Sequence, residues 1–341
     1  MNTSSNETAV RVQALAKRFG AVQAVRDVSL SVQRGEIFGL VGPDGAGKTT
    51  TLRMLAGVLQ PDAGSIELDG VDVLRNAEAA KLHLSYMPQR FGLYDDLTIA
   101  ENIFFYAELF GIPRRQRLQR SKELLDAAGL AGFERRRAGQ LSGGMKQKLG
   151  LVCALIHTPR VLLLDEPTTG VDPVSRRDFW AILYGLREQG VTIIMATAYM
   201  DEAERCTRLA LFHAGQVPYC DTPARLKAAM PGALLAVSAA PPGALRDVLA
   251  AQPGVLGVLL MGDRVHVRVD DAAQRTPQLQ AVLRAHDLGS ARIDPAEPGI
   301  EDVFVALLSA PDTTAAAGSA QPAGAQAGRG AEHAASAELK R

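Results

Sequence analysis

A glycine-rich stretch that carries a lysine and two hydroxyl side chains is the part of this sequence best suited to bind phosphate. Residues 39–50 read GLVGPDGAGKTT and lie between an apolar run and a helical pattern. In that setting glycines let backbone N–H groups close around phosphate oxygens, the lysine reaches the terminal phosphates and the next hydroxyl can ligate Mg²⁺. The alternative for this motif alone is a glycine-rich turn without a ligand. We expect a nucleoside triphosphate to be bound by Gly42, Pro43, Asp44, Gly45, Ala46, Gly47, Lys48, Thr49 and Thr50.

Two adjacent carboxylates end a second apolar run. Residues 161–166 read VLLLDE, which predicts a buried strand that ends in Asp165 and Glu166. Asp165 would lie near the magnesium of a phosphate-binding loop, and Glu166 would lie near the terminal phosphate as a base or as a residue that orients water. Alone, a strand that ends in two acids is weak evidence. Together with the glycine-rich loop it predicts a hydrolytic nucleotide site, with Thr49 and Asp165 as magnesium ligands.

A serine followed by two glycines opens a third stretch, LSGGMKQ at 141–147. At the start of a helix, Ser142, Gly143 and Gly144 would form an N-terminus that can accept a terminal phosphate. An N-cap before an ordinary amphipathic helix is the alternative, and the two interpretations are compatible. The order of GLVGPDGAGKTT, LSGGMKQ and VLLLDEPTTGVD resembles that of the ATP-binding cassette (ABC) family.

This resemblance implies a fold and further site residues. The fold would be α/β, a P-loop NTPase domain with a RecA-like core, an antiparallel β-subdomain and an inserted helical subdomain. Phe19 would stack on adenine, Gln89 would contact the γ-phosphate and magnesium, and Asp172 would lie in the D-loop at a dimer interface. Glu166 and Gln89 would be the catalytic residues. The ATP bound by the opposite subunit would contact the signature residues Leu141, Ser142, Gly143, Gly144 and Met145.

Several short sequence segments resemble those of one branch of that family. GLYDDLT, FYAELFGI, LSGGMKQKL, YMDEAERC and IEDVFVALL are similar to ATPase subunits of drug-resistance exporters of the daunorubicin-exporter type. The resemblance implies ATP and Mg²⁺ as cofactors, a separate membrane permease as partner and a second cassette in a homodimer or heterodimer. It also implies a cytoplasmic location, peripheral on the inner membrane. Export of drugs or other hydrophobic compounds rests on analogy and not on any residue.

Charge and hydropathy limit the other classes of partner. Lys and Arg number 37, as do Asp and Glu, so the chain has no global basic field and we expect no nucleic-acid partner. A soluble ABC ATPase acting on ribosomes or DNA would resemble tandem cassettes or contain a long coiled-coil insertion, and neither pattern occurs. No apolar run reaches the roughly 18 to 20 residues of a membrane span. Because MNTSSNETAV also lacks signal-peptide features, we expect another chain to supply the membrane part.

The chain divides into three predicted parts. We place the cassette at 8–225, with its helical subdomain at about 98–150. A small α+β domain at 230–309 is predicted from paired apolar runs, and a regulatory role for it is implied only by resemblance. The Ala- and Gly-rich residues 310–341 predict a disordered tail. Buried parallel strands are predicted at 10–16, 36–42, 161–166, 191–197 and 209–215, and C-terminal helices at 243–251 and 277–286.

Position 198 departs from the family pattern. The corresponding family sequence is THYMDEAE, whereas residues 197–204 of this chain read TAYMDEAE. Ala198 therefore stands where the family sequence has a histidine. In the family that histidine contacts the γ-phosphate, and loss of one such donor costs about 10²- to 10³-fold in turnover, or roughly 3 to 4 kcal/mol. We expect ATP binding to persist and hydrolysis to be slow. The alternative is a degenerate, mainly ATP-binding partner in an asymmetric heterodimer; a homodimer in which another residue replaces the histidine also remains open.

Overall fold

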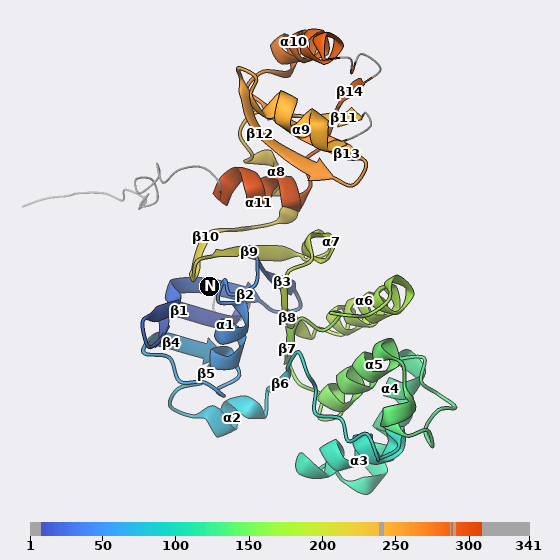
Figure 1. Ribbon diagram of the computed structural model, residues 1–341. Helices are drawn as coiled ribbons and strands as arrows, with labels where there is room; N and C mark the ends of the chain where they lie inside the picture. The colour runs from blue at the N-terminus through green and yellow to red at the C-terminus, as the bar shows by residue number, and fades with distance from the viewer. Residues whose placement is uncertain (1–7, 239–241, 287, 289–290, 309–341) are drawn as a thin grey trace, which may run out of the picture.

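The computed structural model describes residues 8–238, 242–286, 288 and 291–308, so the predicted tail at 310–341 lies outside the described residues. Within them the chain forms three sheets. The N-terminal strands lie beside a central sheet, the helices of residues 99–155 form a separate group, and a third sheet with its two helices lies in the described part of residues 233–295 (Figure 1). None of the described helices is both long enough and apolar enough to cross a lipid bilayer.

A six-stranded sheet is the central element and has the strand order β10-β9-β3-β8-β7-β6. Its strands are β3 (Ile37–Val41), β6 (Leu84–Met87), β7 (Val161–Asp165), β8 (Thr192–Thr197), β9 (Arg208–His213) and β10 (Gln216–Asp221). All neighbours pair in parallel except β10, which is antiparallel to β9. Strands β3 and β7 are buried along their whole length, because helices or a second sheet cover both faces. The predicted α/β class is confirmed.

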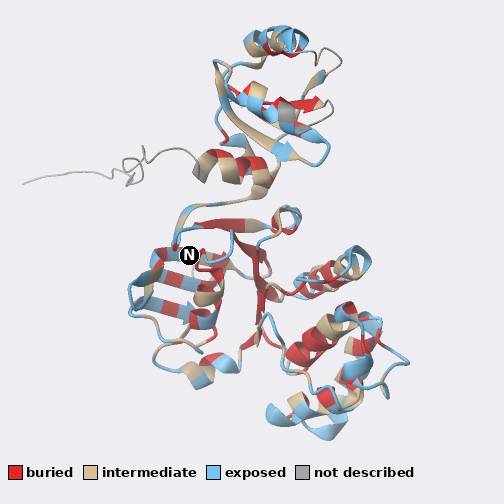
Figure 2. Ribbon diagram, viewed as in Figure 1, coloured by how far each residue is buried: buried red, intermediate tan, exposed pale blue. Residues whose placement is uncertain are grey.

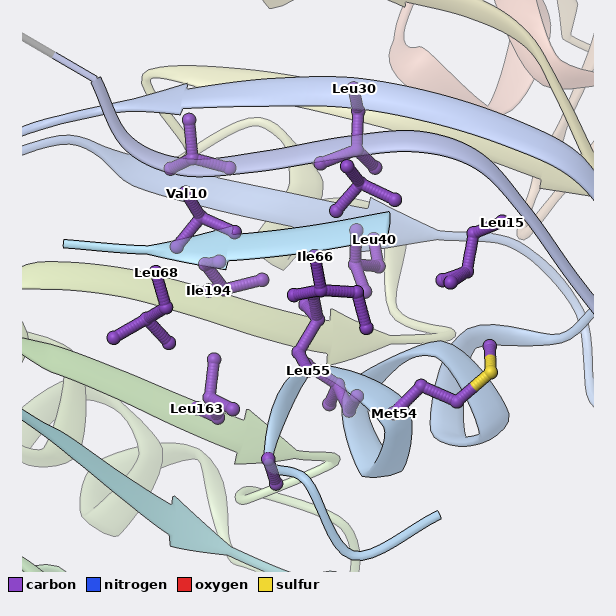
Figure 3. Packing of buried hydrophobic residues seen from close by; sticks show 14 of the residues in the cluster. Val10, Leu15, Leu30, Leu40, Met54, Leu55, Ile66, Leu68, Leu163 and Ile194 are labelled. Carbon is purple, nitrogen blue, oxygen red and sulfur yellow. The ribbon is translucent and has the colours of Figure 1, made fainter. Parts of the chain in front are cut away.

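Alternate residues of the central strands enter two different cores. One core lies between the central sheet, helix α1 (Lys48–Leu55) and the N-terminal sheet (Figure 3). The other contains residues of α5 (Gly143–Leu155) and α6 (Pro173–Glu188), including the fully buried Trp180. The central strands are therefore buried while the outer faces of the helices are exposed (Figure 2).

The predicted strand at 10–16 does not belong to the parallel sheet. It lies in β1 (Thr8–Phe19), part of an antiparallel sheet with the order β2-β1-β4-β5. The other members are β2 (Val22–Gln33), β4 (Ala63–Leu68) and β5 (Val71–Asp72). Only Gly20 and Ala21 separate β1 from β2, and a connection of that length permits only antiparallel pairing, with Gly20 at a φ of 56° in the turn.

Helices α3 (Ile99–Leu109), α4 (Arg114–Ala127) and α5 form the inserted helical group, and the short helix α2 (Ala77–Lys81) precedes β6. Thr98 caps α3 through a reciprocal pair of bonds with Glu101. Asn102 in α3 is fully buried, accepts from the Tyr94 N–H at 2.9 Å and donates to the carbonyls of Tyr94, Leu97 and Thr98. This one side chain ties the loop between β6 and α3, which contains Gln89, to the helical group.

The C-terminal residues form a four-stranded sheet of order β12-β13-β11-β14. Its strands are β11 (Ala233–Ser238), β12 (Val255–Met261), β13 (Arg264–Val269) and β14 (Arg292–Pro295), and the helices beside it are α9 (Pro242–Ala250) and α10 (Ala272–Ala285). Helix α10 begins five residues before the predicted start at Pro277. Asp271 caps it by accepting from the Gln274 N–H, so Pro277 lies within the second turn, whereas the prediction placed it at the first position.

The last helix joins the C-terminal sheet to the rest of the chain. Ile300 and Val303 of α11 (Ile300–Leu308) enter the core that lies beneath β7, β8 and β9. The Ile300 N–H donates to Glu204 Oε1 at 2.9 Å, and Lys227 forms an ion pair with the same carboxylate. Glu204 follows the one-turn helix α7 (Met200–Ala203), and Lys227 lies in α8 (Pro223–Ala228). The segment before β9 and the segment after β10 therefore both lie against α11.

We predict that Asn102→Ala lowers the free energy of unfolding by about 1–3 kcal/mol, because the Tyr94 N–H loses its side-chain acceptor and the carbonyls of Tyr94, Leu97 and Thr98 each lose a bond from a buried amide. Urea denaturation of the purified chain measures the change. Gln116→Ala, at an exposed position of α4, is the control and should stay within about 0.5 kcal/mol of the wild type. Equal effects of the two substitutions would contradict this assignment.

Candidate functional site

Two glycines of the phosphate-binding loop are required by close packing. A Cβ atom on Gly42 would lie 2.3 Å from the Phe212 carbonyl oxygen, and one on Gly47 would lie 2.5 Å from the Ala24 carbonyl oxygen. Gly47 also caps α1 with a φ of 106°, a conformation that favours glycine. The loop after β3 therefore turns directly into the N-terminus of α1, where free backbone N–H groups point outward.

Lys48 is buried inside this loop, and its ammonium group is bonded to the loop's own carbonyls. Its Nζ donates to the carbonyls of Gly42 at 2.7 Å and Pro43 at 2.9 Å, and it lies 3.8 Å from Glu166 Oε1. Burial lowers the pKa of Lys48, and the nearby carboxylates of Glu166, Asp44 and Asp165 oppose that shift. The arrangement keeps a positive charge where a phosphate would bind.

A hydroxyl and a carboxylate from separate elements meet beside Lys48. Thr49 Oγ1 donates to Asp165 Oδ1 at 2.8 Å, and the Tyr86 hydroxyl donates to Asp165 Oδ2 at 3.2 Å. Hydroxyl and carboxylate oxygens are ligands that Mg²⁺ prefers, so these residues fit a magnesium ion held next to bound phosphates. Tyr86 was missed by the sequence reasoning; burial, helped by the charge of Asp165, raises its pKa to about 12, so it stays a donor.

Glu166 adopts an uncommon backbone conformation at the end of β7. Its φ is 48°, a left-handed value that non-glycine residues rarely adopt outside sites that impose it. Its N–H donates to the Ala196 carbonyl at 3.0 Å, and its Oε2 accepts from Gln89 Nε2 at 3.1 Å and from Thr169 Oγ1 at 3.4 Å. The carboxylate is thereby held at the edge of the loop and not in the core.

These groups surround one cavity of about 440 Å³. That size lies in the range of roughly 300–1,000 Å³ typical of small-molecule sites. Phe19 is half exposed at its rim, positioned to stack on a base. Gly42, Pro43 and Asp165 lie behind the lining and hold its residues in place. The lining is formed by Phe19, Ala24, Asp44, Gly45, Ala46, Gly47, Lys48, Thr49, Thr50, Gln89 and Glu166.

The signature residues and Asp172 lie together, away from this cavity. Ser142 caps α5 by accepting from the Met145 N–H at 3.3 Å, and Asp172 caps α6 by accepting from the Val174 and Ser175 N–H groups. A Cβ atom on Gly144 would lie 2.4 Å from Ser175 Oγ, so the two helix starts pack closely. Leu141 is buried and Gly143 exposed at the same helix start, and the described lining of the cavity includes none of the residues from 141 to 145.

Ala198 is exposed in the turn after β8. The preceding Thr197 pairs with Val41 of β3, and the Tyr199 N–H donates to Thr197 Oγ1 at 3.0 Å. The turn therefore lies beside the start of the phosphate-binding loop, and its side chain offers no donor. No histidine among the described residues lines the cavity.

Comparisons with known proteins agree with this geometry. A family model described as "ABC transporter" matches residues 25–169. The chain is 40% identical over 313 residues to the probable multidrug ABC transporter ATP-binding protein YbhF of Escherichia coli (strain K12), an alignment that covers 91% of the chain and 54% of that relative. It thus spans about half the length of that relative.

Two further likenesses extend over most of the compared protein. The daunorubicin/doxorubicin resistance ATP-binding protein DrrA of Streptomyces peucetius is 32% identical, over 91% of this chain and 95% of its own length. A solved structure titled as the ATP-binding subunit of an ABC transporter is 29% identical with a TM-score of 0.60, over 65% of this chain and 92% of its own. Because its sequence is similar to these relatives over most of its length and its fold is similar to that solved cassette, this chain is a member of the ABC transporter ATP-binding family.

Proposed function

We propose that this chain is an ATP-hydrolysing subunit that powers a separate membrane permease. The observation that carries the proposal is that the phosphate-binding loop, Glu166 and Gln89 line the same cavity. A site that only bound a nucleotide would not need a carboxylate held at the mouth of the loop in a left-handed conformation.

Each side chain has a distinct role in the proposed reaction. The backbone N–H groups at the start of α1 and the Lys48 ammonium bind the phosphates and offset their charge. Magnesium, held by Thr49 and Asp165 with Gln89 as a further ligand from the same cavity lining, would supply further charge neutralisation. Glu166 orients the attacking water and accepts its proton, and Gln89 fixes that carboxylate through the 3.1 Å bond.

The separation of the signature residues from the cavity supports a dimer of cassettes. The N-terminus of helix α5, capped by Ser142, is a suitable partner for a terminal phosphate, but that start lies outside this chain's own cavity. We infer that residues 141–145 and Asp172 complete the site of a second cassette, while the partner's residues complete this one. Closure around two ATP molecules then transmits movement to the permease through the loop that contains Gln89.

We propose that the transporter is an exporter and that this subunit lies at the cytoplasmic face of the membrane. The names of the relatives refer to multidrug transport and to daunorubicin and doxorubicin resistance, so we propose hydrophobic compounds as the transported class. We also propose that the missing histidine at position 198 slows hydrolysis without preventing ATP binding, because the loop, Lys48 and the magnesium ligands are intact.

We predict that Lys48→Ala and Glu166→Gln separate binding from turnover. Loss of the ammonium should weaken ATP binding by about 10- to 100-fold, because a charged hydrogen bond contributes about 1.5–3 kcal/mol. Glu166→Gln should bind ATP with wild-type affinity and lose about 10²- to 10⁴-fold in turnover. Titration calorimetry and phosphate release at concentrations that favour dimers measure the two effects. Glu188→Gln, on the exposed end of α6, is the control; persistent turnover in Glu166→Gln would refute the assigned role.

We predict that Ala198→His raises turnover by about 10²- to 10³-fold, since an imidazole restores a donor for charge that develops on the γ-phosphate. ATP affinity should change little. Ala131→His, at an exposed position before α5, provides the matched control. A folded Ala198→His chain that hydrolyses ATP no faster than the wild type would mean that position 198 does not limit the reaction.

A further inference from the structure

Glu202, in the one-turn helix α7, is a fully buried carboxylate. Its Oε2 accepts from Thr197 Oγ1 at 2.6 Å, and its Oε1 accepts from Thr168 Oγ1 and from the Trp180 indole at 3.4 Å. None of the ion pairs among the described residues includes Glu202. A buried carboxylate is costly unless it is hydrogen-bonded, so the position of Glu202 depends on these three donors, and their positions depend on Glu202.

Two of the three donors come from segments next to the ATP site. Thr168 lies two residues after Glu166, in the loop that leads to Asp172 and α6. Thr197 is the last residue of β8, directly before Ala198. Trp180 is in α6, which begins after Asp172. Glu202 is thus bonded at once to the loop with the proposed water-orienting carboxylate and to the turn that lacks the histidine.

Further bonds, from Thr197 itself and from the neighbour of Thr168, connect these donors to the reacting groups. Thr197 Oγ1, which donates to Glu202, also accepts from the Tyr199 N–H at 3.0 Å, so the backbone on both sides of position 198 is held. Thr169, the neighbour of Thr168, donates to Glu166 Oε2 at 3.4 Å. A displacement of either threonine would move Glu166 or the turn, and a misplacement of about 1 Å near a reacting group can cost about 10²-fold in rate.

We propose that Glu202 is a positioning residue for ATP hydrolysis, which holds the loop from Glu166 to Asp172 in register with the turn at Ala198. This inference rests on the proposed function of the site. Glu202 does not touch the cavity itself, and it acts through Thr168 and Thr197. A role in stability alone would lower the melting temperature without separating turnover from ATP binding.

The same region supplies a matched control. Glu204 lies two residues from Glu202, but its carboxylate contacts Lys227 and the Ile300 N–H on the side of α11. Glu202→Gln and Glu204→Gln therefore make the same chemical change on opposite sides of one short segment. Only the first alters bonds to the loop that carries Glu166.

The test compares turnover, ATP affinity and folding in these variants. Glu202→Gln should lose about 10- to 100-fold in kcat with an ATP dissociation constant within about twofold of the wild type, while Glu204→Gln keeps both. Melting followed by the fluorescence of Trp180, the only tryptophan, checks the fold. Thr168→Val removes one donor while keeping the side chain's shape, and covers the case in which Glu202→Gln does not fold. If the folded variant retains wild-type kcat, the inference is overturned.

A second measurement does not depend on hydrolysis. Amide exchange with a non-hydrolysable ATP analogue bound should be faster in Glu202→Gln than in the wild type at 166–172 and 197–199, and unchanged there in Glu204→Gln. Unchanged exchange in Glu202→Gln would overturn the inference. A wild-type chain that binds ATP without turnover would refute the proposed function alone, and faster exchange in Glu202→Gln would then still support the positioning role.

Discussion

The parallel register of β3, β8 and β7 is the constraint on which the site depends. Val41 pairs with Thr197, and Ala196 pairs with Asp165, so three strands end at one edge of the sheet. From that edge emerge the phosphate-binding loop, the paired acids and the turn at Ala198. In parallel α/β sheets, ligands bind at the carboxyl ends of the strands because the loops that follow them converge there. A shift of one residue in any pairing would separate Thr49 from Asp165 and remove the proposed magnesium site.

Buried polar side chains then fix the loops that the strands only bring near one another. Asn102 holds the loop that contains Gln89 through four bonds to its backbone. Glu202 holds the loop after Glu166 and the turn after β8. Glu202 accepts from three donors, whereas Asn102 satisfies the Tyr94 N–H and adds a second bond to carbonyls that already accept from backbone N–H groups. Each arrangement is therefore specific as well as stable.

Packing also decides which parts of the chain act together. The last helix, α11, belongs to the core beneath β7 and β8, although the C-terminal sheet that precedes it in the sequence has its own core. The signature residues pack against the start of α6 and not against the cavity. Proximity along the chain therefore does not predict which segments share a site, because strand pairing and helix packing set the distances.

The sequence by itself determined the family, the fold class and most of the cavity's lining. The phosphate-binding loop and the paired acids are local motifs, and their residue types specify the backbone conformation that each motif requires. The sequence also predicted the positions of most strands, because continuous apolar runs indicate buried strands directly. Tyr86, Asn102 and Glu202 were not found: a lone polar residue in a short strand or helix looks like surface until its partners are known. Only the tertiary structure decided that β1 pairs antiparallel, that α10 begins at Ala272 after the Asp271 cap and that one of three acids in YMDEAE is buried, because each depends on partners distant in sequence or on a competing cap.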